Sequence, residues 1–102
     1  MPQFVRVAAL NEIPDGTSKE VELQGRVVAL FNRNGQIHAI DGICPHAGGP
    51  LSEGTLDGFV VTCPWHGWQF DVTSGRSVYN SACVQQCYEV RIEGGEILLS
   101  LP

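Results

Sequence analysis

The sequence has 102 residues, 43% of them hydrophobic, which is enough chain for one compact domain with a modest core and too little for two. Eleven acidic residues against six basic ones give a formal net charge of −5, which disfavours nucleic acid and anionic membranes as partners and favours a basic protein surface. Because no leader-like stretch and no apolar run of membrane-spanning length occur, we expect a soluble cytoplasmic protein with a single domain over residues 1–102.

Short apolar runs separated by turn residues make up the first part of the chain. Twelve glycines and six prolines punctuate the whole sequence, and no segment has a sustained helical period, so an all-β fold is predicted. The β-branched and aromatic residues of 4–10 predict a first strand, which the turn signal at 14–16 ends. Alternating apolar and polar residues over 20–24 predict a half-buried second strand, and Gly25 separates it from the apolar run 27–31.

The strongest hairpin signal is the run Asn-Arg-Asn-Gly at 32–35, because Asn and Gly accept the positive φ of tight turns. Residues 36–40 should therefore return antiparallel to the preceding strand. His38 lies within this return strand without a cysteine or carboxylate at ligand spacing, so it is interpreted as a partly exposed strand residue and left out of the site. The stretch 44–50 is too rich in glycine and proline for a regular element and is predicted to be a loop.

The second half of the chain repeats this pattern of short strands and turns. Its predicted strands are 59–62, 68–71, 88–92 and 96–101, and the turns that separate them lie at 57–58, 73–75 and 94–95. A second loop, 63–67, directly follows the first of these strands. The loops 44–50 and 63–67 should therefore lie together at one end of a β scaffold.

Each of the two loops carries one cysteine and one histidine, Cys44 with His46 and Cys63 with His66. Two sulfur and two nitrogen ligands suit zinc or an iron–sulfur centre rather than a hard cation. A single residue separates Cys44 from His46, which is tighter than the usual spacing in structural zinc sites, so a zinc-stabilised interaction domain is the weaker alternative. The four residues match the Rieske centre, a [2Fe–2S] cluster in which two histidines replace two cysteines on one iron.

The flanks of both pairs resemble the cluster-binding loops of the small Rieske-type ferredoxins that serve ring-hydroxylating dioxygenases. The similar runs are Gly-Gly-Pro-Leu-Ser-Glu-Gly at 48–54 and Cys-Pro-Trp-His-Gly-Trp-Gln-Phe-Asp at 63–71. This resemblance implies a Rieske iron–sulfur domain, an antiparallel β sandwich with two cluster-binding loops at one end. It also implies that Cys44 and Cys63 bind one iron while His46 and His66 bind the other.

As a function, the resemblance implies a one-electron carrier rather than an enzyme. The chain would take an electron from a flavin-containing reductase and pass it to a terminal oxygenase, with the outer edges of His46 and His66 as the route between cluster and partner. We expect it to act as a monomer. The alternative is a small Rieske-like subunit of assimilatory nitrite reductase or of another oxidoreductase complex, although many such subunits lack the cluster ligands and this chain has all four.

Differences from the high-potential Rieske proteins of bc-type complexes bear on the reduction potential. Those proteins have an additional cysteine in each loop, and the two cysteines form a disulfide. This chain has Gly49 and Trp65 at the matching positions. In addition, Trp68 replaces a serine whose hydroxyl would donate to a cluster sulfur. Fewer donors mean a lower potential, so we expect a midpoint near the lower limit of the Rieske range, about −150 mV. Gly48, Gly49 and Gly67 are expected to let main-chain N–H groups approach the sulfurs closely, and such donors favour the added electron.

The segment 80–87 lacks the proline that related ferredoxins usually have near the cluster, and it contains two further cysteines. Cys83 and Cys87 would allow a second metal or a redox disulfide, but no histidine or second cysteine pair lies close by in the sequence. We therefore expect both residues to be buried, unreactive thiols.

Overall fold

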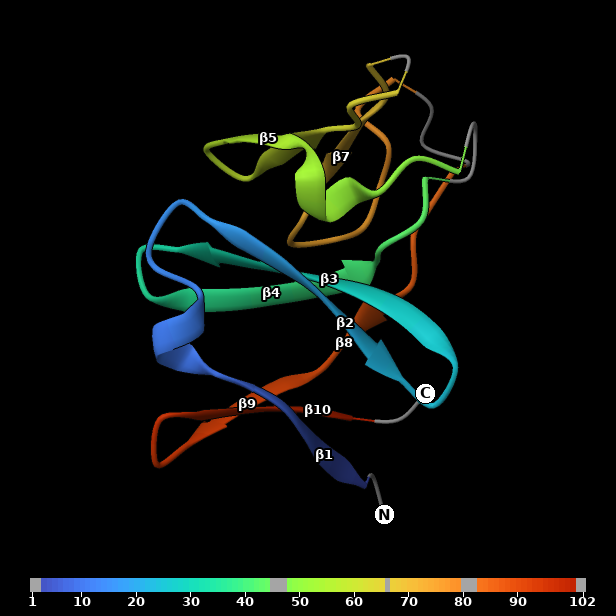
Figure 1. The fold of residues 1–102 in the computed structure, drawn as a ribbon. Coiled ribbons are helices and arrows are strands. Elements are labelled where there is room, and N and C mark those ends of the chain that lie inside the picture. Colours follow the sequence, from blue (N-terminus) through green and yellow to red (C-terminus); the bar gives the residue numbers. More distant parts are fainter. Residues whose placement is uncertain (1–2, 45–47, 66, 80–82, 101–102) are drawn as a thin grey trace.

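The computed structural model describes residues 3–44, 48–65, 67–79 and 83–100, and their regular structure is almost entirely β (Figure 1). The strands are β1 (Phe4–Ala9), β2 (Ser18–Leu23), β3 (Arg26–Arg33), β4 (Gln36–Asp41), β5 (Thr55–Asp57), β6 (Val60–Thr62), β7 (Gln69–Asp71), β8 (Cys87–Tyr88), β9 (Val90–Glu93) and β10 (Glu96–Ser100). Two short 3-10 helices, η1 (Leu10–Glu12) and η2 (Leu51–Glu53), interrupt them. None of the helical structure within the described ranges is long and apolar enough to cross a membrane. The all-β prediction is confirmed.

The strands form three antiparallel sheets. Their strand orders are β1-β10-β9, β2-β3-β4-β8 and β5-β6-β7. In Figure 1 the first two sheets lie one above the other, and the small third sheet lies beyond the β3–β4 hairpin, at the end opposite to β1. The prediction of stacked antiparallel sheets is therefore confirmed, with the third sheet as an addition at one end.

Tight turns explain why β2, β3 and β4 follow one another as neighbours. Arg33 pairs with Gln36 across Asn34 and Gly35, and both turn residues have positive φ, 56° and 84°. The turn between β2 and β3 likewise has two residues of positive φ, 49° and 81°. Turns of this kind match the right-handed twist of the flanking strands, so the Asn-Gly signal forms the predicted hairpin.

Strand β3 has both faces buried, which explains its continuous apolar run. Val28 and Leu30 face the core between the first two sheets, whereas Ala29 and Phe31 face a second core beneath the small sheet. Because successive side chains of a strand point to opposite faces, one strand contributes to both cores. The other buried residues of the second core are Ile40, Cys44, Leu51, Val61, Cys63, Phe70 and Val72.

Most strand boundaries lie one or two residues from the predicted ones, and two of these differences have a clear structural basis. The first strand ends at Ala9 because the chain turns into η1, where the Glu12 carboxylate accepts a 2.7 Å hydrogen bond from the Ala9 N–H. Tyr88 does not belong to the closing hairpin: it pairs with Ala39 in the second sheet, and the hairpin strand β9 begins only at Val90. The switch between sheets was not predicted because the apolar alternation continues through it without interruption.

Candidate metal centre

Cys44 and Cys63 come from different hairpins and meet in the second core. Cys44 lies just beyond β4 and Cys63 directly follows β6. Both are almost fully buried, 1% and 2% exposed, among residues such as Leu51 and Phe70. Burial raises the pKa of the Cys63 thiol, and the neighbouring Cys44 thiol raises it further. The structure therefore brings the two predicted sulfur ligands side by side.

Backbone hydrogen bonds close the first loop around Cys44. Its N–H donates to the Gly49 carbonyl, and its own carbonyl accepts from the Gly48 N–H, both at 2.8 Å. A β-bridge joins Ile43 to Pro50 at the two ends of the loop. Gly48 has a φ of +76°, which glycine adopts without a steric penalty. The Gly48 N–H thus donates to the loop backbone.

The second loop supplies a donor to sulfur. The Trp65 N–H donates to the Cys63 Sγ, with the nitrogen 3.4 Å from the sulfur. The Cys63 N–H in turn donates to the Trp68 carbonyl at 2.7 Å, which closes this loop as well. An N–H directed at a metal-bound sulfur favours added negative charge there. The close approach of further main-chain N–H groups to the sulfurs, expected from Gly48, Gly49 and Gly67, stays a prediction.

The two tryptophans of the second loop have different surroundings. Trp68 packs against the second core, and its ring lies 6.4 Å from that of Phe70. Trp65 is 51% exposed, yet its Cγ would be only 2.9 Å from a Cβ placed on Gly49. Trp68 is thus a core-packing residue, whereas Trp65 joins the two loops and also presents an outer surface.

The two predicted nitrogen ligands, His46 and His66, lie outside the described residues. In the ranges that the structure does describe, no three His, Cys, Asp or Glu side chains form a metal-binding group. The structure does bring together two buried thiols and an N–H donor to one of them. Soft ligands of this kind fit an iron–sulfur centre or zinc, and the sequence places a histidine shortly after each cysteine.

His38 packs within the scaffold as a half-buried strand residue, as interpreted from the sequence. Its ring makes an edge-to-face contact with Phe59, with centroids 5.8 Å apart. Its Nε2 is buried and has no hydrogen-bond partner among the described residues. Burial lowers the pKa of His38, although Asp71 opposes this effect. Burial therefore favours the neutral form of the imidazole.

Cys83 and Cys87 are free, half-buried thiols that pack against the second core. Burial raises the pKa of Cys87, and Asp71 and Asp41 raise it further, which disfavours the reactive thiolate. These observations support unreactive thiols rather than a redox disulfide.

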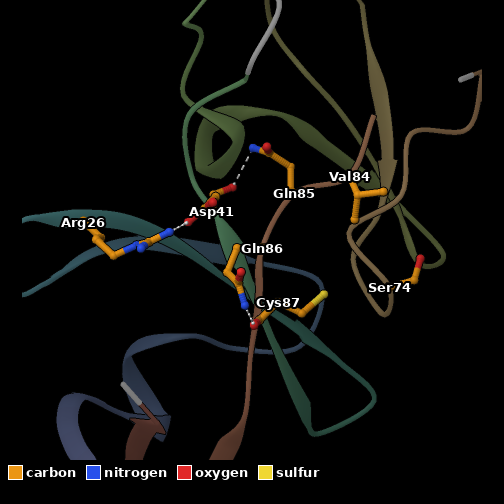
Figure 2. Close-up of a pocket in the computed structure, with 7 residues that line it drawn as sticks. All are labelled: Arg26, Asp41, Ser74, Val84, Gln85, Gln86 and Cys87. Atoms are coloured by element: carbon orange, nitrogen blue, oxygen red, sulfur yellow. Dashed lines mark hydrogen bonds and ion pairs between the residues drawn. The ribbon is translucent and has the colours of Figure 1, made fainter. Parts of the chain in front are cut away.

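A polar concavity lies beside the entry to the first loop (Figure 2). It is lined by Arg26, Asp41, Ser74, Val84, Gln85, Gln86 and Cys87. Gln85 is buried here, and its Nε2 donates to the carbonyls of Asp41 and Ile43. An ion pair joins Arg26 Nη2 to Asp41 Oδ1 at 3.7 Å. The sequence interpretation missed Gln85 because no local signal distinguishes it from the exposed Gln86 that follows it.

Comparison with known proteins finds a matching family model and similar proteins. The family model of the Rieske [2Fe-2S] domain matches residues 3–92. The chain is 36% identical to the ferredoxin component of the naphthalene 1,2-dioxygenase system of Pseudomonas aeruginosa, over 97% of this chain and 96% of that protein. It is also similar to a chain in the complex of reduced oxygenase and oxidized ferredoxin in carbazole 1,9a-dioxygenase, with a TM-score of 0.84 and 33% identity over 95% of this chain and 92% of that one.

A second kind of protein has the same fold. A Mycobacterium tuberculosis protein described as an NADH-dependent nitrite reductase small subunit matches with a TM-score of 0.91, covering 100% of this chain and 97% of that one. Its sequence identity is 22%, so this likeness concerns the fold alone.

Proposed function

This chain belongs to the Rieske [2Fe-2S] domain family, and we propose that it is the ferredoxin component of an oxygenase system, a one-electron carrier without bond chemistry of its own. The main structural support for this proposal is the pair of adjacent, buried thiols of Cys44 and Cys63. They lie in a chain that matches a dioxygenase ferredoxin over almost its whole length. We propose that residues 1–102 act as one domain.

Four residues would hold the cluster, Cys44 and Cys63 on one iron and His46 and His66 on the other. When bound, the cluster takes up and returns one electron. The described residues contribute two things to this chemistry: they bury the two sulfurs, and they direct the Trp65 N–H at the Cys63 Sγ. That donor favours the negative charge that arrives with the electron.

We propose a flavin-containing reductase as the electron donor and a terminal oxygenase as the acceptor. The oxygenase is supported by the likeness to the carbazole 1,9a-dioxygenase complex, in which oxygenase and ferredoxin occur together. The net charge of −5 favours a basic docking face on each partner. We further propose a monomer in the cytoplasm, where the thiols stay reduced until the cluster is assembled.

The second candidate function is a small subunit of a nitrite reductase or another oxidoreductase complex, which the shared fold favours. A carrier must dissociate from its donor to reach its acceptor, whereas a subunit stays bound to one enzyme. All four predicted ligands are present, which fits a carrier and also a subunit that binds a cluster. It argues against a subunit that has no cluster. Identity to the dioxygenase ferredoxin, at 36%, favours the carrier.

The test begins with the metal and ends with the partner. Iron and acid-labile sulfide are measured on the purified protein, with about two of each expected per chain, and EPR of the reduced protein should have an average g value typical of mixed His/Cys ligation. Zinc without sulfide would refute the cluster. Turnover of a terminal oxygenase that depends on this protein supports the carrier, whereas a stable complex with a nitrite reductase and no transfer to oxygenases would favour the second candidate.

A further inference from the structure

Gly49 of the first cysteine loop and Trp65 of the second approach each other closely. A Cβ placed on Gly49 would lie 2.8 Å from the Cys63 Sγ and 2.9 and 3.0 Å from the Cγ and Cβ of Trp65. Real Cβ atoms almost never come this close to other heavy atoms, so the loops approach to a distance that only a residue without a side chain allows. The contact lies directly beside a candidate ligand sulfur.

The requirement for glycine at this position is one of space. Gly49 does not have a positive φ, whereas Gly48 and Gly67 do, at +76° and +74°. A Cβ on either of those two would meet no atom within 4 Å. The loop glycines therefore divide into two that allow the backbone to turn and one, Gly49, that makes room for the Trp65 side chain.

Trp65 makes two contacts beside the candidate metal centre. Its backbone N–H donates to the Cys63 Sγ at 3.4 Å, and its side chain lies against the backbone of Gly49 on the other loop. The residue is 51% exposed, so the rest of its surface is removed from water, and the contact with Gly49 contributes to this burial, which the hydrophobic effect favours.

We propose that Trp65 is a positioning residue: by packing on Gly49 its indole holds the loop at 44–50 against the loop at 63–68 and limits the access of water to the Cys63 sulfur. The inference rests on the proposed function, because the sulfur matters as a cluster ligand. It adds a non-covalent link between the loops, and it gives the exposed tryptophan a role in keeping the cluster bound.

The first test compares wild-type holoprotein with Trp65→Ala and Trp65→Phe. Cluster loss is followed by the decay of visible absorbance in the presence of a chelator, and the midpoint potential is measured by redox titration. We expect Trp65→Ala to shorten the lifetime by about tenfold, the lower end for changes around metal ligands, and to raise the potential because water at the sulfur stabilises the reduced form. Trp65→Phe should restore both values toward wild type. An unchanged lifetime, or an unchanged or lower potential in Trp65→Ala, would overturn the proposal.

A double-mutant cycle tests the contact itself. Gly49→Ala places a methyl group against the Cγ and Cβ of Trp65 and against the Cys63 sulfur, and in the Trp65→Ala background the clash with the Trp65 Cγ is removed while those with the Cβ of residue 65 and the Cys63 sulfur remain. We therefore expect Gly49→Ala to shorten the lifetime by a smaller factor in that background than in the wild type. Independent, multiplicative effects on the lifetime would mean that the two residues do not interact.

Two further variants keep the test decisive. Tyr79→Ala removes another exposed aromatic side chain, 77% exposed, and should leave lifetime and potential unchanged. If Trp65→Ala cannot be isolated with its cluster, Trp65→Leu takes its place, with an intermediate lifetime expected and a wild-type lifetime contradicting the inference. A wild-type protein without iron and sulfide would refute the proposed function, whereas a normal cluster that ignores every Trp65 substitution would refute this inference alone.

Discussion

The side-chain Nε2 of Gln85 donates a 2.6 Å hydrogen bond to the carbonyl of Ile43, the residue immediately before the candidate ligand Cys44. The same nitrogen donates to the Asp41 carbonyl at 3.2 Å, and the Gln85 backbone N–H donates to the Gly75 carbonyl at 2.7 Å. Gln85 is only 6% exposed, so water cannot easily replace these bonds. A segment late in the chain thus fixes the backbone that delivers Cys44.

Replacing Gln85 by leucine should destabilise the protein and loosen the cluster. Leucine keeps much of the side-chain volume but leaves the Ile43 and Asp41 carbonyls without their donor, which costs about 1–3 kcal/mol for buried polar groups. We expect the free energy of unfolding to fall by that amount in urea titrations. The chelator-induced loss of the cluster should become faster as well, because the backbone before Cys44 is no longer held.

The next residue provides the matched control. Gln86 is exposed, and its Nε2 donates only to the carbonyl of the adjacent Cys87, at 2.9 Å. Gln86→Leu should therefore change the free energy of unfolding by no more than about 0.5 kcal/mol. Equal effects of Gln85→Leu and Gln86→Leu would show that the bond to Ile43 does not support the first loop.

A second polar network fixes the sheet switch at Tyr88. Its hydroxyl donates to Asp41 Oδ1 at 2.6 Å and accepts from Arg26 Nε at 2.9 Å. Tyr88→Phe removes the hydroxyl and leaves the buried face of Asp41 without this donor. Because hydrogen bonds to charged groups contribute about 1.5–3 kcal/mol, we expect a loss of that size in the free energy of unfolding at pH 7, measured by urea titration.

The same network predicts a pH dependence at alkaline pH. Burial, followed by the hydrogen bond to Asp41, raises the pKa of Tyr88 from 10 to about 12. The unfolded chain therefore loses the phenol proton before the folded protein does, so this contribution is complete below pH 10 and is lost as the pH rises toward 12. The stability difference between wild type and Tyr88→Phe should shrink over that range. A difference that stays constant, or a similar trend in Tyr79→Phe, would contradict the assignment.

Local signals were sufficient for most of the fold. The Asn-Gly turn at 34–35 has the two positive φ values that its residue types favour, and the apolar run of β3 corresponds to a strand buried on both faces. The sequence did not reveal that Tyr88 leaves the closing hairpin for the second sheet. That choice depends on Asp41 and Arg26, which are distant in the sequence, so no local pattern could indicate it.

The candidate site, too, could be predicted only in part from the sequence. Ligand spacing identified Cys44 and Cys63, which the structure brings together. Gly49 was expected to let main-chain N–H groups approach the sulfurs, and the sequence did not reveal that it also makes room for Trp65. Gln85 was missed altogether. Close approach and burial arise from contacts between distant segments, so a single sequence contains the residue types but not the distances between them.

The four cysteines should separate into two classes by substitution. Cys44→Ser and Cys63→Ser each replace a thiolate at the predicted cluster iron, so these proteins should be isolated with little iron or acid-labile sulfide. Cys83→Ser and Cys87→Ser should retain about two of each per chain, because both side chains are half-buried free thiols outside the loops. Loss of the cluster in either member of the second pair, with the fold intact by circular dichroism, would refute the assignment of unreactive thiols.

The reduction potential should be low for a Rieske centre, near about −150 mV at the lower limit of the range. Hydrogen bonds to the sulfurs stabilise the reduced cluster, and the described residues provide Cys63 with one, a long bond from the Trp65 N–H. The Trp68 side chain, at the position where high-potential proteins have a donating serine, instead packs toward Phe70 and the second core. A redox titration followed by EPR checks the value, and a midpoint above about +100 mV would mean that donors to sulfur lie elsewhere in the two loops. The Trp65→Phe holoprotein, which keeps this backbone donor, should titrate close to the wild type.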